Sequence, residues 1–237
     1  LGHLICAGNR IALPEHSWAS SPYSETLMNH IVLLGDSIFD NKAYVDGGLD
    51  VVAHLRRQIP AEWKATLRAV DGSVVEDVRK QAYDLPDGAT HLIVSAGGNN
   101  AILNADILQQ KAASSAEVLE KLADVAGTFE YHYRGMLQAV LSLKKPTTVC
   151  TIYYPRMPEP FVQKIAVAAL TVFNDVIIRQ AFLAGVPLID LRLVCNEDAD
   201  YANEIEPSEA GGGKIADAIV RLVKEHKFES RRTEAFI

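Results

Sequence analysis

The sequence predicts one α/β domain, a three-layer α/β/α sandwich around a five-stranded parallel sheet. The first observation is that short apolar runs alternate with helical patterns from Met28 onward. The second is that these runs are rich in Val, Ile and Leu without polar alternation. Uninterrupted apolar strands are typical of a sheet buried on both faces, and alternation with helices is typical of βαβ units.

The expected elements follow one another in a regular order. Strands are expected at His30–Leu34, Ala65–Val70, His91–Ser95, Thr147–Tyr153 and Val186–Asp190. Helices are expected near Leu49–Gln58, Val74–Tyr83, Ala116–Leu143, Pro160–Ala184 and Ser208–His226, and a short helix plus a loop within Ile102–Ser115. This order is typical of a flavodoxin-like fold, in which ligands bind beyond the carboxyl ends of the strands.

The domain is expected to span residues 28–237. Residues 1–27 are rich in Ser, Pro, His and Gly and show no sustained period, whereas Met28 directly precedes a strong strand. We therefore expect residues 1–27 to be an N-terminal extension outside the core; the alternative is an arm packed on the surface. The extension has no basic region followed by an apolar block, so no secretory signal is expected and a cytoplasmic location follows.

Composition narrows the range of partners. The net charge is −7 and no basic stripe is visible, so no nucleic-acid partner is expected. The segment 161–184 is apolar, but charged and amide side chains interrupt it, which favours a core or amphipathic helix over a membrane span. The apolar surface of this segment could also be the contact face of a homo-oligomer. The three cysteines are widely spaced, so neither a disulfide framework nor a zinc site is expected.

Three turns at predicted strand ends carry residues suited to chemistry. Gly35-Asp36-Ser37 follows the first strand, where Ser37 is placed either as a nucleophile or as the cap of a following helix. Asp71-Gly72-Ser73 follows the second strand, and Gly97-Gly98-Asn99-Asn100 follows the third. Glycine N–H groups and amides are good donors to a developing oxyanion, although tight turns use the same residue types.

These turns resemble the motifs of the SGNH, or GDSL-type, hydrolases over about residues 28–226. Gly35-Asp36-Ser37 resembles the nucleophile motif, and Gly72 resembles the lone glycine of the second motif. Gly97–Asn100 resembles Gly-x-Asn-Asp, with Asn100 in place of the aspartate. The resemblance implies a Ser37 nucleophile and an oxyanion hole made by the Ser37 and Gly72 N–H groups and the Asn99 side chain. It implies no metal and no organic cofactor.

The last motif departs from the family. Such chains end in Asp-x-x-His-Pro, whereas this one has Asn203-Glu204-Ile205-Glu206-Pro207, with Asn203 for the aspartate and Glu206 for the histidine. No other histidine is expected to replace the missing one. His30 and His91 begin their strands, about 20 Å from Ser37. The remaining five lie in the extension or in predicted helices: His3, His16, His54, His132 and His226.

Glu206 is the remaining candidate for a general base. A carboxylate is a weaker base than imidazole by about 3 kcal/mol, but burial would raise its pKa and recover part of that difference. The neutral Asn203 would orient Glu206 by donating a hydrogen bond from its amide. The alternative is that Glu206 is an exposed residue near a helix N-terminus, where negative charge is favourable.

The functional prediction is a serine esterase that hydrolyses small-molecule carboxylic esters. Ser37 would be the nucleophile, Glu206 the base and Asn203 the orienting residue. The first alternative is a catalytically inactive protein of this fold that binds a small acylated or carbohydrate ligand. The second is a nucleotide-binding flavodoxin-like domain, which the acidic residues Asp36 and Asp40 near the first turn disfavour.

Overall fold

A six-stranded parallel sheet forms the centre of the molecule in the computed structural model, which describes residues 28–230 and 232–237. The strand order is β2-β1-β3-β4-β5-β6. The strands are β1 (His30–Gly35), β2 (Lys64–Leu67), β3 (His91–Ser95), β4 (Thr147–Cys150), β5 (Leu188–Ile189) and β6 (Ala235–Phe236). The order reverses between β1 and β3, so a crevice forms beyond their carboxyl ends.

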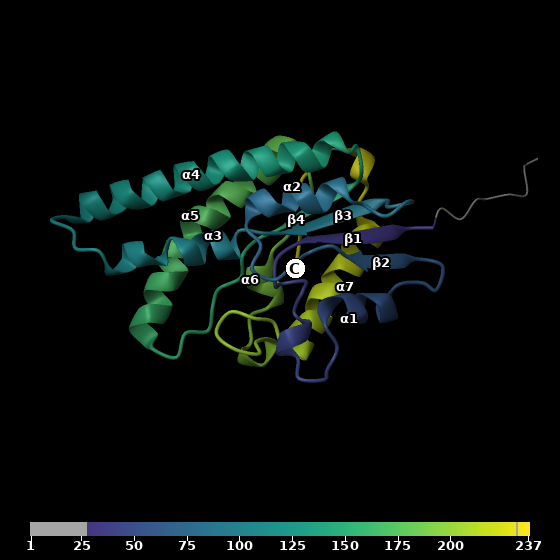
Figure 1. Ribbon diagram of the computed structural model, residues 1–237, viewed down its shortest axis with the longest axis horizontal. Coiled ribbons are helices and arrows are strands. Elements are labelled where there is room, and N and C mark those ends of the chain that lie inside the picture. Colours follow the sequence, from purple (N-terminus) through teal and green to yellow (C-terminus); the bar gives the residue numbers. More distant parts are fainter. Residues whose placement is uncertain (1–27, 231) are drawn as a thin grey trace, which may run out of the picture.

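Helices cover both faces of this sheet. They are α1 (Val51–Gln58), α2 (Val75–Tyr83), α3 (Gly98–Leu103), α4 (Ser115–Ser142), α5 (Pro160–Ala184), α6 (Leu191–Val194) and α7 (Glu209–Glu225). Short 3₁₀ helices are η1 (Lys42–Tyr44), η2 (Ala105–Gln109), η3 (Asp198–Asp200) and η4 (Phe228–Ser230). Figure 1 shows α1 and α7 on one side of the sheet and α2, α4 and α5 on the other. The predicted three-layer sandwich is confirmed.

The two faces of each strand enter two separate cores. Ile31 and Leu33 of β1 join the core made with α1 and α7. Val32 and Leu34 of the same strand join the core made with α2, α4 and α5. Successive side chains of a strand point to opposite faces, which explains why β1 contains an apolar residue at every position from 31 to 34.

The sheet has one strand more than predicted. β6 pairs with β5 through bonds from Leu188 N to Glu234 O and from Asp190 N to Phe236 O, both 2.9 Å. Two residues in a polar tail are too few to show the alternation of apolar residues that would predict a strand. The strand β6 forms only because its backbone pairs with the free edge of β5. The predicted extension, residues 1–27, lies outside the described residues and stays a prediction.

Helix α5 has two unlike halves. By length and composition it is the one described helix apolar enough to cross a membrane, with a mean hydropathy of 1.7 in its most apolar window. In its C-terminal half, Phe173, Val176 and Ile177 are buried against the sheet and α4. Its N-terminal half lies with α3 and the start of α4 beyond the strand ends, on the left of Figure 1. Packing on the sheet therefore explains the apolar composition of the C-terminal half of α5 and leaves that of the N-terminal half unexplained.

The end of β1 is held by an unusually close contact with β3. Gly35 has a φ of +133°, and a Cβ atom there would lie 1.7 Å from the carbonyl oxygen of Ser95. The buried Gln81 side chain accepts from Gly35 N at 2.7 Å and donates to Gly35 O at 2.8 Å. Only glycine fits this position, and Gln81 satisfies the peptide groups that the turn removes from the sheet.

We expect Gln81→Leu to lower the free energy of unfolding by about 1–3 kcal/mol, because the Gly35 N–H would be left buried without a partner, whereas Gly35 O would keep the bond that Val70 N donates at 3.1 Å. Urea denaturation measures this change. Gln138→Leu, at an exposed position of α4, is the matched control and should stay within about 0.5 kcal/mol of the parent protein. Equal effects of the two substitutions would contradict the role given to Gln81.

Candidate active site

Ser37 lies in the turn that directly follows β1. Its side chain is mostly buried, with 8% of the residue exposed. The next helix is η1, whose N-cap is Asn41, so Ser37 does not cap a helix. The capping alternative for Ser37 is therefore wrong, and its hydroxyl lines a cavity at the carboxyl end of the sheet.

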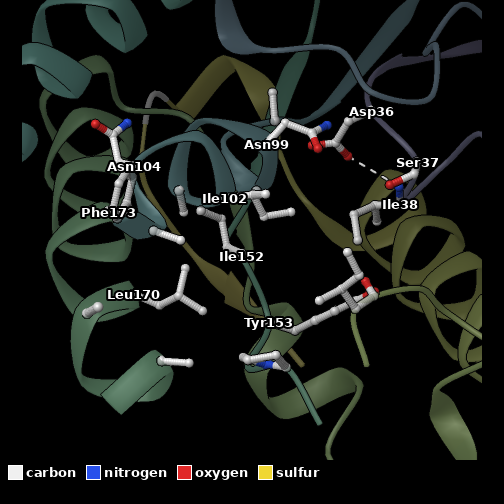
Figure 2. Close-up of a pocket in the computed structure, with 18 of the residues that line it drawn as sticks. Asp36, Ser37, Ile38, Asn99, Ile102, Asn104, Ile152, Tyr153, Leu170 and Phe173 are labelled. Atoms are coloured by element: carbon white, nitrogen blue, oxygen red, sulfur yellow. Dashed lines mark hydrogen bonds between the residues drawn. The ribbon is translucent and has the colours of Figure 1, made fainter. Parts of the chain in front are cut away.

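The cavity has a volume of about 160 Å³ and brings together the turns after β1 and β3 with the loop before α7. Its polar end contains the side chains Asp36, Ser37, Ser95, Asn99 and Glu206. Figure 2 shows Asp36, Asn99 and Ser37 grouped at this end, and Leu170 and Phe173 at the other end. Three residues predicted from the sequence, Ser37, Asn99 and Glu206, thus share one cavity despite lying far apart in the chain.

Glu206 is only 5% exposed, so the expectation of a solvent-exposed Glu206 near the helix N-terminus is wrong. Four hydrogen bonds fix the loop that contains it. The backbone N–H of Ala202 donates to Glu206 O at 2.8 Å, and the Tyr153 hydroxyl donates to Ile205 O at 2.6 Å. Asn203 Oδ1 accepts from the N–H groups of Ile205 and Glu206, both at 2.9 Å. These contacts hold the Glu206 backbone while its side chain enters the cavity.

Asn203 does not touch the Glu206 carboxylate in the way the sequence suggested. We expected its amide to donate to that carboxylate, but its carbonyl oxygen binds the backbone of the loop instead. Among the described residues, the buried Oε2 of Glu206 has no hydrogen-bond partner. The short side chain of an asparagine bonds more readily to backbone N–H groups two or three residues further along the chain than to a more distant carboxylate. Asn203 therefore positions the Glu206 backbone.

The surroundings of Glu206 make its carboxyl group a stronger base than an ordinary carboxylate. Burial raises the pKa of Glu206 from 4.5 to about 7. The nearby Ser37 side chain acts in the opposite direction, and the negative charge of Asp71 raises the pKa of Glu206 further. At neutral pH a large share of the molecules would carry an ionised Glu206 beside the Ser37 hydroxyl.

Asp36 is a second buried acid in the cavity that the sequence reasoning did not assign to the site. It is 2% exposed, and burial raises its pKa to about 7, although the Ile38 N–H donates to its Oδ1 at 3.2 Å. The negative charge of Glu206 raises the pKa of Asp36 as well. The two carboxyl groups therefore titrate in the same range and influence each other. The signal available in sequence was its place beside Ser37.

The residues expected to form the oxyanion hole are only partly brought together. Asn99 lines the cavity, and its Nδ2 donates to Ser73 O at 2.9 Å, which ties the third motif to the second. Ser37 lines the same cavity, and the part of its N–H in the oxyanion hole remains a prediction. Gly72, with a φ of +78°, is exposed and does not line the cavity. The part of Gly72 in the oxyanion hole remains a prediction.

Two asparagines that the motifs did not explain have structural partners. Asn100, which stands where the family has an aspartate, accepts from Val75 N at 3.1 Å and so satisfies the start of α2. The fully buried Asn41 accepts from Val51 N at 3.0 Å and donates to Pro207 O at 3.2 Å. Asn41 therefore links the chain segment after Ser37 to the residue that follows Glu206.

The histidines of the described residues lie away from the cavity, as expected. His30 bonds to Thr66, His132 lies 3.1 Å from a carboxylate oxygen of Glu76, and His226 bonds to Glu234. His91 bonds to Thr90, and His54 packs against Gly213 of α7. None of the five lines the cavity. No group of three or more His, Cys, Asp or Glu side chains in the described part of the chain is arranged to hold a metal ion.

The fold is similar to those of several solved hydrolases. An acetyl xylan esterase gives a TM-score of 0.62 at 17% identity, covering 82% of this chain and 99% of that chain. The lipase/acylhydrolase from Enterococcus faecalis gives 0.59 at 20%, covering 83% and 96%. The extracellular lipase from Streptomyces rimosus gives 0.57 at 16%, covering 78% and 95%. At these identities the likeness concerns the fold alone.

No curated protein sequence matches the chain. The model of the GDSL-like lipase/acylhydrolase family matches residues 33–212, which is most of the domain and includes the turn with Ser37 and the loop with Glu206. The resemblance of the sequence motifs, the sheet order and the family match agree. The chain belongs to the GDSL-like lipase/acylhydrolase family.

Proposed function

We propose that the protein is a serine esterase in which Ser37 is the nucleophile and Glu206 is the general base. One observation carries this proposal: a buried Glu206 with a pKa of about 7 lies in the same cavity as the Ser37 hydroxyl. A general base works best when its pKa is near the working pH. Burial thus supplies much of the basicity that the missing histidine would provide.

In the first half of the reaction, Ser37 Oγ attacks the carbonyl carbon of the ester. Glu206 takes the hydroxyl proton as the new C–O bond forms, and negative charge moves to the carbonyl oxygen. When the tetrahedral intermediate collapses, the bond to the leaving alcohol breaks. Glu206 returns the proton to that oxygen, which leaves a neutral alcohol and an acyl group on Ser37.

The second half repeats these steps with water. Glu206 takes a proton from the water that attacks the acyl carbon, and the bond between Ser37 Oγ and the acyl carbon breaks. The proton passes back to Ser37 Oγ, which restores both residues and releases a carboxylic acid. Because one group gives and takes the same proton, a pKa near 7 serves both directions better than an ordinary carboxylate would.

The charge on the carbonyl oxygen needs donors near Ser37. The backbone N–H of Ser37 and the Asn99 side chain are the candidates that the cavity offers. Asn99 Nδ2 donates one of its two hydrogens to Ser73 O, which fixes the plane of the amide. The other hydrogen is left to bind the substrate. Removing one such donor from a hydrolase typically costs a hundredfold to a thousandfold in rate, about 3–4 kcal/mol.

The buried acid also separates this function from the inactive alternative. Burying an ionisable carboxyl without a partner for Oε2 is unfavourable, and a site that only bound an acylated ligand would not require it. Strongly shifted carboxyl groups in a cavity are typical of acid–base catalysis. This arrangement therefore favours an active esterase over an inactive protein that only binds a ligand.

We expect Ser37→Ala to abolish hydrolysis of a p-nitrophenyl ester and Glu206→Gln to lower kcat/KM by about a hundredfold to ten-thousandfold. The amide introduced by the second substitution would keep the shape of the side chain and lose its basicity. Rates of the purified variants measured against the parent protein test this. Unchanged hydrolysis by Ser37→Ala would contradict the nucleophile assignment, and unchanged hydrolysis by Glu206→Gln would contradict the base.

The pH profile should report the shifted acid. Only ionised Glu206 accepts a proton, so kcat/KM should fall as the pH drops through about 7 and level off above it. Asp71→Asn removes a negative charge that raises the pKa of Glu206, so the acid limb should move to lower pH. Asp217→Asn, an exposed position on α7, is the matched control. A profile that Asp71→Asn leaves in place would contradict this coupling.

Stability should show the same linkage. The raised pKa means that the folded state favours protonated Glu206, so its contribution is complete below about 4.5 and is lost as the pH rises through about 7. Glu206→Gln should therefore stabilise the protein by up to about 3 kcal/mol at pH ~8 and by much less at pH ~5. Urea denaturation at both values measures this, and a pH-independent difference would contradict it.

A further inference from the structure

The cavity extends well beyond the residues that the proposed reaction uses. From Ser37 it continues between α3, η2, α4 and α5, at the end of the molecule where the helices pass the strands. Figure 2 shows Ile102 and Ile152 in the middle of this space and Leu170 and Phe173 at its far side. The apolar residues that line this region are Ile102, Ala105, Ile107, Leu108, Leu122, Val125, Ile152, Ala166, Ala169, Leu170 and Phe173.

The charged groups in this cavity are confined to one end. The charged lining residues, Asp36 and Glu206, both lie beside Ser37, and no Lys, Arg or His of the described chain lines the cavity. Asn104 is the polar side chain at the apolar end, and its Nδ2 donates to Asn100 O at 2.8 Å. The far region therefore offers few free partners for sugar hydroxyls and no cation for a phosphate.

The apolar region is also partly open. Ile102 is 49% exposed and Leu108 is 40% exposed, although both line the cavity. Large apolar side chains that surround an open space are typical of a ligand site, whereas a structural core closes over such side chains. A ligand in this space would cover apolar surface that the protein itself leaves in contact with water.

We propose that this region binds the acyl chain of the substrate, so that the preferred esters carry linear aliphatic acyl groups longer than acetyl. The inference rests on the proposed esterase function only in placing the ester carbonyl at Ser37. The chain would run from Ser37 past Ile102 and Ile152 toward Leu170 and Phe173. Acetyl groups on a polysaccharide are the poorer substrates, since they would leave this region empty and find few hydrogen-bond partners in it.

The chain-length dependence of hydrolysis tests the proposal. Each methylene buried in an apolar site should raise kcat/KM roughly three- to fourfold. We expect kcat/KM to rise in this way from p-nitrophenyl acetate through the butanoate to the hexanoate. A rate that is flat or falls from acetate to hexanoate would overturn the proposal, and so would faster hydrolysis of an acetylated xylooligosaccharide than of the hexanoate.

Two neighbouring alanines of α5 provide a matched pair of variants. Ala169 lines the cavity, whereas Ala168 is exposed and does not. Ala169→Phe should fill the apolar region and reduce the hexanoate-to-acetate ratio of kcat/KM about tenfold, and Ala168→Phe should leave that ratio unchanged. The same ratio in both variants would overturn the placement of the chain.

A binding measurement separates this proposal from the esterase function. Calorimetric titration of the Ser37→Ala protein with 2-butanone, 2-hexanone and 2-octanone should give Kd values that tighten roughly three- to fourfold per methylene, less so in Ser37→Ala/Ala169→Phe. Chain-dependent binding without hydrolysis by the parent protein would overturn the esterase and support the chain site. Hydrolysis of acetate together with chain-independent binding would overturn the chain site and keep the esterase.

Discussion

The close approach of Gly35 to Ser95 is the constraint on which the site depends. β1 can turn sharply after its last residue only because no side chain occupies the space that the Ser95 carbonyl fills. That turn directs Asp36 and Ser37 into the crevice between β1 and β3. Gln81 secures it by bonding both backbone groups of Gly35, which connects α2 directly to the turn that contains Ser37.

The acid–base chemistry proposed for the site depends on two carboxyl groups that are buried, where their ionised forms are unfavourable. Glu206 and Asp36 are both nearly excluded from water, and burial is the main reason that the pKa of each rises to about 7. The folded protein loses stability when these groups ionise, and the same desolvation gives Glu206 the basicity that the proposed reaction requires. Asn203, Tyr153 and Asn41 hold the loop around Glu206, which keeps it from moving into solvent.

In the function that we propose, the region that selects the substrate is separated in space from the residues that cleave the ester bond. The polar groups lie at the strand ends, where parallel strands bring their following turns together. The apolar walls come from the parts of α3, η2, α4 and α5 that extend beyond the sheet. Because α4 and α5 are buried in the core through residues of their C-terminal halves, apolar side chains of their N-terminal halves near the cavity are free to contact a ligand. One cavity thus joins two surfaces of unlike chemistry.

The sequence by itself determined the layers, five strands with their order along the chain, and the glycine turn before Ser37, because each depends on local patterns: apolar runs, helical periods and a glycine at the end of a strand. It also marked Glu206 by its place before Pro207. Only the tertiary structure decided that Glu206 is buried, that Gln81 secures Gly35, and that β6 adds to the sheet. Burial, long-range hydrogen bonds and edge pairing join residues distant in sequence, and no local pattern specifies them.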